Sequence, residues 1–554
     1  MDRRATLSTL LGRKKKQTAQ KKTTAAMTLG SGLSPYSGAW GYAQAAHLLR
    51  RSTFGATNAQ IKQAVADGMA ATISKLFSDQ PMPDPPVNYY FRNDPNVPIG
   101  STWVDQPYSA QTNFANYRRR SLFAWTFGLL LNEGISIREK MTLFWHNHFV
   151  TENINDPKFK YVYISLLREN ALSNFKRLVK KITIDPSMLL YLNGNQNSRR
   201  APNENYAREL FELFTIGKGE LAGPGDYTTF TEDDVVEAAR VLTGWVVQGY
   251  LGAGGLEPTP LFVQNRHDIT QKKLSHRFNN AIINDNGQYE YGDLVDIIFQ
   301  QEEVSRFICR KFYRWFVYYD INEEVEMNVI EPMAQMLRDN DFEVKPVLEA
   351  LLQSEHFYDP ACMGAMIKNP LDFMVGLLRQ SEVKFSEDVT PKYLEWLAFF
   401  GYTDDLQMVY FIPPNVAGWK AYYQEPSYYQ FWINSTTLSK RLVFTDALTQ
   451  AAIVIGQNVL KIDVLDFISK LDDALDVNNM IDEITNIFLP MGVTEAQRDA
   501  LKELLIPGLP DYEWTIEYSN YLGDPSDEEL KQSVERKLQS FMKTLFSMAE
   551  IHLS

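Results

Sequence analysis

The chain is organised around one stretch, Asn203-Glu-Asn-Tyr-Ala-Arg-Glu-Leu-Phe-Glu-Leu-Phe-Thr-Ile-Gly-Lys-Gly219. Its apolar residues recur at helical spacing on one side, and polar residues occupy the other side. Two glycines, Gly217 and Gly219, follow the last apolar residue. Because glycine readily adopts the left-handed conformation that closes helices, this pattern predicts a helix that ends at these glycines.

The polar side of this helix carries a stripe formed by Asn205, Glu209 and Glu212 at positions i, i+4 and i+7. With Asn205 as the zero angle, both glutamates lie within about 40° of it, and Arg208 lies beside them. One interpretation is a pair of carboxylates that bind a cation or act as acid and base. The other is a solvent-exposed face with charge pairs four residues apart. Periodicity alone favours the exposed face.

Helical patterns dominate the rest of the chain, strand candidates are few, and no alternation of strands and helices indicates a parallel sheet. We therefore predict an all-α fold, a large multi-helix array. Glycines and short β-type runs predict a small irregular or β-hairpin insertion near 246–266. We expect a basic flexible tail at 1–30, a main helical domain with the polar motifs at 31–440, and a C-terminal helical segment at 441–554 packed on it.

The composition excludes several classes of protein. Of the 554 residues, 45% are hydrophobic and 22% are charged, which is the balance of an ordinary globular chain. A net charge of −13 argues against a nucleic-acid binder, which needs a basic face. The two cysteines, Cys309 and Cys362, cannot form a disulfide framework. No apolar run reaches the roughly 18 residues of a transmembrane segment.

The amino-terminal residues leave the location of the protein open. Met1-Asp-Arg-Arg-Ala-Thr-Leu-Ser-Thr-Leu-Leu-Gly12 is similar to the start of a twin-arginine export signal. However, Arg13-Lys-Lys-Lys16 interrupts the apolar region that a working signal needs. We therefore expect a basic tail, and the location is either the periplasm or the cytoplasm.

Two of the seven histidines lie in Phe144-Trp-His-Asn-His-Phe149. A His-x-His pair can bind one metal ion when the backbone is extended, because alternate side chains then share a face. In a regular helix the two side chains point about 200° apart. His146 and His148 therefore chelate one ion only if the helix ends or distorts here.

A second histidine motif, Arg266-His-Asp268, ends the glycine-rich insertion. A His-Asp pair in a loop is a common metal-binding or acid–base element, although such neighbours also occur by chance. Thr231-Glu-Asp-Asp234 is interpreted differently, as the capped start of a helix. The sequence shows no nucleophile elbow, no Walker phosphate loop, no dinucleotide fingerprint and no His-Glu-x-x-His zinc motif, so several large enzyme classes lose support.

Several motifs occur in order along the chain, and together they are more specific than any one of them. They are Ala46-His-Leu-Leu-Arg-Arg-Ser-Thr-Phe-Gly55, Trp145-His-Asn-His-Phe149, the stretch 203–217, the segment 227–245, His267-Asp268, Lys368-Asn-Pro370 and Pro414-Asn-Val-Ala-Gly-Trp419. This set resembles the bacterial domain-of-unknown-function family 1800, over nearly the whole chain after about residue 40. The resemblance implies a largely helical fold and an exported or envelope role. It also implies a candidate partner from family 1501, which is similar to the alkaline-phosphatase and sulfatase superfamily and is often encoded nearby.

The resemblance also changes the interpretation of the polar residues, because the matching motifs are rich in them. We expect these residues to line one cavity: His146, His148, Asn205, Arg208, Glu209, Glu212, His267 and Asp268. Lys368 and Asn415 are further candidates for the same polar cavity.

Two hypotheses follow. The first is a metal-assisted hydrolase in or near the cell envelope, with a divalent metal ion and a general base. Its metal ligands would be His146, His148, His267 and Asp268; its catalytic residues would be Glu209 or Glu212 with Arg208. The second is a non-catalytic envelope or assembly protein that binds a protein partner or a polysaccharide through aromatic surfaces around 422–432. Polar residues scattered over solvent-facing helices would favour the second hypothesis.

Overall fold

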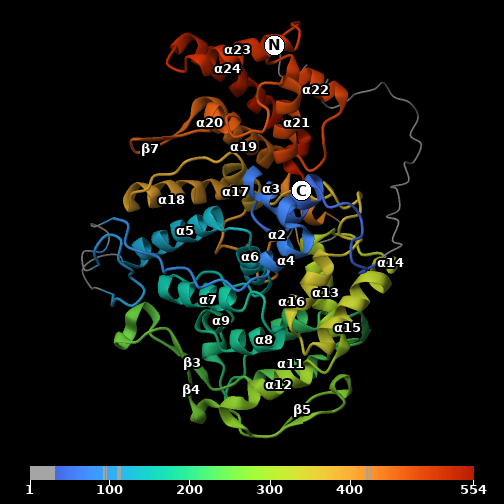
Figure 1. Ribbon diagram of the computed structural model, residues 1–554. Helices are drawn as coiled ribbons and strands as arrows, with labels where there is room; N and C mark the ends of the chain where they lie inside the picture. The colour runs from blue at the N-terminus through green and yellow to red at the C-terminus, as the bar shows by residue number, and fades with distance from the viewer. Residues whose placement is uncertain (1–31, 91–93, 95–96, 109–113, 420–421, 423–426) are drawn as a thin grey trace.

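The structure is a computed structural model that describes residues 32–90, 94, 97–108, 114–419, 422 and 427–554. The predicted tail at 1–30 lies outside these residues. Within them the chain forms 23 α-helices and four small two-stranded antiparallel sheets (Figure 1). The prediction of an all-α fold is confirmed.

The first group of helices surrounds the centre of the molecule. These helices are α2 (Tyr42–Ser52), α3 (Asn58–Asp67), α4 (Met69–Leu76), α5 (Phe114–Asn132), α6 (Arg138–His148), α7 (Pro157–Glu169), α8 (Phe175–Thr183) and α9 (Pro186–Tyr191). Side chains that accept hydrogen bonds from first-turn amides fix where several of them begin. Asp156, Asn174 and Asp185 do so for α7, α8 and α9.

The middle of the chain contains the organising stretch and three of the hairpins. The stretch forms α10 (Asn205–Glu209) and continues as the π-helix η2 (Leu210–Thr215) before α11 (Glu232–Val241). The strands here are β1 (Leu221–Gly223), β2 (Asp226–Tyr227), β3 (Trp245–Gln248), β4 (Thr259–Phe262), β5 (Lys272–Lys273) and β6 (Ile282–Ile283). The β3–β4 hairpin confirms the predicted insertion, with Trp245 opposite Phe262.

The remaining chain is again helical. Its helices are α12 (Glu290–Ile298), α13 (Glu302–Phe316), α14 (Glu323–Val325), α15 (Glu331–Asp339), α16 (Val344–Leu352), α17 (Pro370–Gln380), α18 (Val389–Asp405), α19 (Ser435–Asp446), α20 (Val464–Ile468), α21 (Val477–Phe488), α22 (Glu495–Lys502), α23 (Tyr512–Gly523) and α24 (Glu528–Leu545). One hairpin, β7 (Ile453–Ile455) with β8 (Asn458–Leu460), interrupts them.

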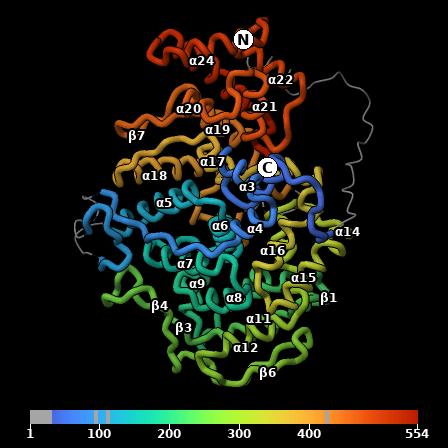
Figure 2. Tube along the Cα trace, viewed as in Figure 1, coloured from blue at the N-terminus to red at the C-terminus, as the bar shows by residue number. Residues whose placement is uncertain are grey.

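The arrangement places α6 near the middle of the molecule, with the hairpins β3–β4 and β5–β6 at one end and α19 to α24 at the other (Figure 1). Every residue of α6 from Glu139 to His148 is buried. The last residues of the chain return to α2 and α17 (Figure 2). There Ile367 pairs with Leu553, and the amide of Lys368 donates to the carbonyl of His552 at 2.7 Å.

The buried apolar residues form one continuous core from Ala45 to Ile551. Residues of the predicted C-terminal segment, such as Ile487 in α21 and Leu538 in α24, belong to this core. The predicted boundary at 440 falls inside α19. Among the described residues, no helix has both the length and the apolar composition needed to cross a membrane.

Candidate functional site

The helix α10 presents Arg208 to two carboxylates. Its guanidinium donates to both oxygens of Glu232, at 3.0 and 2.8 Å, and to Glu204 at 3.1 Å. Glu232 is the first residue of α11, so this pair joins the start of α11 to α10. Arg208 is therefore held as a bidentate bridge between two helices.

The two glutamates of the stripe differ in their surroundings. Glu212 forms an ion pair with Lys218 at 3.3 Å. Half-buried Glu209 has no hydrogen-bond or ion-pair partner in the part of the chain that the structure describes. Burial, together with the neighbouring charge of Glu212, raises the pKa of Glu209 to about 7. Glu209 can therefore exchange a proton near neutral pH.

The His-x-His pair lies inside the helix α6, which ends only after His148. The Nδ1 atom of His146 lies 3.0 Å from the hydroxyl of Tyr163, and its Nε2 atom accepts from the amide of Phe411 at 3.2 Å. The tyrosine hydroxyl itself donates to the carbonyl of Phe149 at 2.6 Å. Both ring nitrogens of His146 are thus engaged by the protein.

His148 has an equally complete set of partners on the other side of α6. Its Nε2–H donates to the carbonyl of Phe214 at 3.0 Å, and its Nδ1 atom accepts from the ammonium of Lys311 at 3.0 Å. Burial and a nearby lysine lower the pKa of each histidine, to about 3 for His146 and well below the ordinary value for His148. The helix therefore directs two neutral rings into two separate hydrogen-bond networks.

His267 belongs to a different cluster, near the hairpin β5–β6. Its Nδ1–H donates to the carbonyl of Thr243 at 2.8 Å, and its Nε2 atom lies 3.0 Å from Oε1 of Glu290. Lys272 donates to the other oxygen of Glu290 at 2.6 Å. His267, Lys272 and Glu290 are all buried. Although burial acts to lower it, the hydrogen bonds to Glu290 and Thr243 raise the pKa of His267.

Asp268, the neighbour of His267, is directed elsewhere. Its carboxylate accepts from Nε of Arg240 at 2.9 Å and from the amide and hydroxyl of Thr270. Although burial acts to raise it, these hydrogen bonds lower the pKa of Asp268 to about 2. The carboxylate is therefore held ionised against an arginine.

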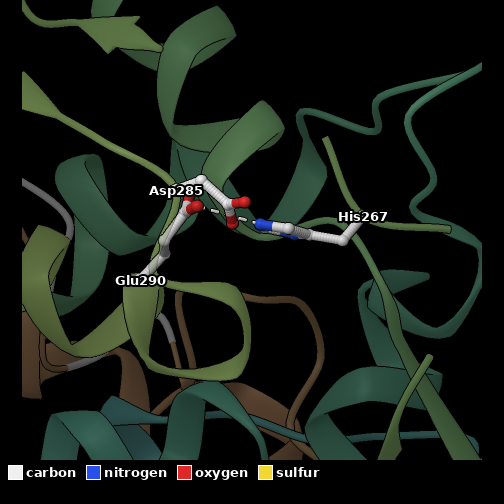
Figure 3. A group of neighbouring side chains, drawn as sticks. All are labelled: His267, Asp285 and Glu290. Atoms are coloured by element: carbon white, nitrogen blue, oxygen red, sulfur yellow. Dashed lines mark hydrogen bonds and ion pairs between the residues drawn. The ribbon is translucent and has the colours of Figure 1, made fainter. Parts of the chain in front are cut away.

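Two carboxylates that sequence reasoning missed, Asp285 and Glu290, complete the cluster around His267. One ligand atom each from His267, Asp285 and Glu290 lie within 4.8 Å of one another (Figure 3). Asp285 is exposed, whereas the other two residues are buried. Asp285 and Glu290 lie in the turn after β6 and at the first position of α12. The hairpin brings them back to His267, and no spacing in the sequence predicts this contact.

The remaining predicted residues, Asn205, Lys368 and Asn415, lie at three other positions in the fold. Asn205 is exposed, and its amide donates to Asn203 at the start of α10. The ammonium of Lys368 donates to the carbonyl of Ile551 at 3.0 Å, beneath α17. Asn415 accepts from the amide of Ala417 within its own loop. The predicted polar residues thus bind partners at separate sites, and they do not line one cavity.

The fold and the site define a mostly helical protein with a cluster of one histidine and two carboxylates beside the β5–β6 hairpin. The chain belongs to the DUF1800 family, whose model, described as a protein of unknown function, matches residues 47–515. The resemblance seen in the sequence is therefore confirmed. No match was found among curated proteins or among solved structures.

Proposed function

We propose that the protein is a metal-assisted hydrolase whose divalent cation is held by His267, Asp285 and Glu290. The observation that carries this proposal is the convergence of the three ligand atoms within 4.8 Å (Figure 3). Of the ligands predicted from the sequence, His267 alone belongs to this set. His146, His148 and Asp268 are committed to other partners, as described above.

The geometry of the cluster suits a cation. The Nε2 atom of His267 and Oε1 of Glu290 form a hydrogen bond at 3.0 Å in this structure. A cation bound between them would replace the shared proton, with a small adjustment, because tetrahedral ligand atoms about 2.1 Å from one ion lie about 3.4 Å apart. The bond from Nδ1–H to the carbonyl of Thr243 fixes the imidazole so that Nε2 faces the carboxylates, an orientation typical of histidine ligands.

The chemical role follows from the number of ligands. Three protein ligands leave coordination positions for water and substrate, and a bound divalent cation lowers the pKa of coordinated water and polarises the bond to be cleaved. The exposed side chain of Asp285 places the open side toward solvent. A mixed imidazole and carboxylate set suits Zn²⁺ or Mn²⁺.

The stripe on α10 has no part in this proposal. Among the described residues, Glu209 and Glu212 make no hydrogen bond or ion pair with the cluster. They lie near the start of α11, where Arg208 binds Glu232, whereas His267 lies beside Thr243 beyond the end of α11.

The test measures metal content and affinity by mass spectrometry and calorimetry, with Zn²⁺ and Mn²⁺ as probes. We expect about one ion per chain, and an affinity that falls at acid pH because the metal competes with a proton for Nε2 of His267. Asp285→Asn, an exposed change that spares the core, should lower affinity by roughly tenfold or more. Hydrolysis of p-nitrophenyl esters by the loaded protein should fall in parallel.

The matched control is Asp268→Asn, which changes the neighbouring carboxylate that binds Arg240. It should keep the metal. Equal affinity in the wild type and Asp285→Asn, or a wild type that binds neither ion, would reject the metal site.

A second candidate is the non-catalytic function, the binding of a partner such as a family-1501 protein or of a polysaccharide at the cell envelope. The relevant observation is the aromatic segment at 422–432. Among its described members, Tyr422, Tyr429 and Trp432 are buried and Phe431 is 47% exposed. These rings therefore favour a pocket over a flat docking surface. A co-purification in which metal-depleted protein retains a stable partner would support this second function.

A further inference from the structure

One buried lysine, Lys272, contacts the proposed cation site. It begins the strand β5, where its side chain is buried while that of Lys273 is exposed, since alternate residues of a strand point to opposite faces. The ammonium of Lys272 donates to Oε2 of Glu290 at 2.6 Å and to the carbonyl of Asp268. A positive charge thus lies beside a group that would itself bind a cation.

The two oxygens of Glu290 have different partners. Oε1 lies 3.0 Å from Nε2 of His267 and accepts from the amide of Asn286 at 3.1 Å. Because a carboxylate oxygen has two lone pairs, Oε1 can keep the bond to the amide while a cation replaces the proton shared with His267. Oε2 instead binds the ammonium of Lys272. Only Oε1 is therefore joined to His267, by the contact that a dashed line marks in Figure 3.

The contact between Lys272 and Glu290 is difficult to break. Both side chains are fully buried. Within the described ranges, Glu290 is the only carboxylate at ion-pair distance from Lys272. A buried ammonium that loses its carboxylate has neither a counter-charge nor the solvation of water, which is strongly unfavourable. Lys272 should therefore keep Oε2 when an ion binds, and Glu290 should supply one ligand atom.

The site then offers few protein ligand atoms. His267 supplies one nitrogen, Glu290 supplies one oxygen, and exposed Asp285 supplies one or both of its oxygens. Zn²⁺ needs about four ligands, so three protein atoms and a water complete its shell. Ca²⁺ takes roughly six to eight oxygens and commonly binds carboxylates through both oxygens. A second oxygen from Glu290 would therefore help Ca²⁺ more than Zn²⁺.

We infer that Lys272 is a positioning residue that restricts Glu290 to one oxygen and so makes the site prefer Zn²⁺ to Ca²⁺. This inference rests on the proposed metal site and identifies what decides its ion. The imidazole nitrogen of His267 acts in the same direction, because nitrogen ligands suit Zn²⁺ better than Ca²⁺. That contribution is unchanged when Lys272 is replaced, so mutation separates the two causes.

Calorimetry on the full chain, with ZnCl₂ and CaCl₂ as titrants, tests the role of Lys272. The variant is Lys272→Met, whose unbranched apolar side chain adapts to the same space without binding Oε2. Loss of a positive charge strengthens the attraction of both divalent ions alike, so the ratio of the two affinities isolates the effect of the second oxygen. In the variant, the affinity for Ca²⁺ should rise about tenfold more than that for Zn²⁺.

The matched control is Lys273→Met, which removes the same charge from the exposed neighbour on β5. It should leave the ratio of the two affinities as in the wild type. A wild type that binds Zn²⁺ but whose ratio is the same in both lysine variants would overturn the role of Lys272 alone. A wild type that binds neither ion would overturn the metal site and this inference with it.

A second measurement needs no variant and applies if Lys272→Met fails to fold. A crystal structure of the zinc-loaded wild type should show one oxygen of Glu290 on the ion and the ammonium of Lys272 on the other oxygen. Both oxygens on the zinc ion, or a lysine that has left Glu290, would contradict the inference.

Discussion

At the scale of single residues, each buried histidine of α6 forms hydrogen bonds through both of its ring nitrogens. His146 links Tyr163 to the backbone at Phe411, and His148 links Phe214 to Lys311. A neutral imidazole has one donor and one acceptor, so each ring satisfies two partners at once. Loss of such a ring leaves buried polar groups without partners, which costs about 1–3 kcal/mol for each group.

The most unusual ionisable residue of α10 is Glu209, and its titration should appear in the stability of the protein. The folded state raises its pKa from 4.5 to about 7. A raised pKa means that the folded protein binds the proton more tightly, so stability is lost as pH rises from about 4.5 to 7. Between pH 4.5 and pH 8, the free energy of unfolding of the wild type should therefore fall by about 1 kcal/mol relative to that of Glu209→Gln, after allowance for solvent screening.

Urea unfolding of wild type and variant at the two pH values measures this difference. Glu220→Gln, at an exposed position further along the chain, is the control and should show no such change. A Glu209→Gln variant whose difference from wild type is the same at both pH values would contradict the raised pKa.

At the scale of elements, the organising stretch combines a short α-helix with a π-helix. The amide of Ile216 donates to the carbonyl of Phe211 at 3.2 Å, five residues back, and the hydroxyl of Thr215 donates to the carbonyl of Leu210. This wider turn changes the direction of residues after 210 relative to those before it. Single-turn π-helices are frequent at functional sites.

The end of this element depends on Gly217, which has a φ of +77°. A Cβ atom there would lie 2.7 Å from the ring of Phe307 on α13. Gly217→Ala should therefore destabilise the protein by about 2–3 kcal/mol, from backbone strain and the steric clash together. Chemical denaturation measures the loss.

Gly508→Ala separates the two contributions. Gly508 has a φ of +67°, and no atom lies within 4 Å of an added Cβ. Its substitution should cost only about 1 kcal/mol. Equal costs at the two glycines would show that Phe307 does not oppose a side chain at 217.

The elements also show how far the sequence determines this fold. Periodicity and the glycines predicted the all-α class and the β3–β4 hairpin, because both signals are local. The β5–β6 hairpin was not predicted, since strands of two residues carry no period. That hairpin brings Asp285 and Glu290 to His267, so the cluster of one histidine and two carboxylates could not be predicted from the sequence. Helical geometry had already indicated that His146 and His148 would diverge in a regular helix.

At the scale of the whole molecule, the predicted C-terminal segment shares its core with the rest of the chain. The side chain of Gln380 in α17 donates to the carbonyl of Ile487 in α21 at 2.7 Å, and Arg50 of α2 donates to the same carbonyl. A continuous core favours cooperative unfolding. We therefore expect one thermal transition in calorimetry, with equal calorimetric and van't Hoff enthalpies.

Hydrogen exchange provides an independent check of this cooperativity. Amides of α21 should exchange with the same free energy of opening as those of α2, because the two helices lose their common core together. Two resolved transitions, or an α21 that opens well before α2, would show that the residues after 440 form a separate unit.

The hydrogen bond between Arg50 and the carbonyl of Asn486 has a consequence for folding during synthesis. The two residues are 436 positions apart in the chain. At a synthesis rate of 5–20 residues per second, the ribosome needs roughly 20–90 s to produce the partner of this arginine. During that interval the guanidinium of Arg50, which is buried in the folded protein, lacks both of its carbonyl partners, at Asn486 and Ile487. The native environment of α2 is therefore completed only after the residues of α21 have been synthesised.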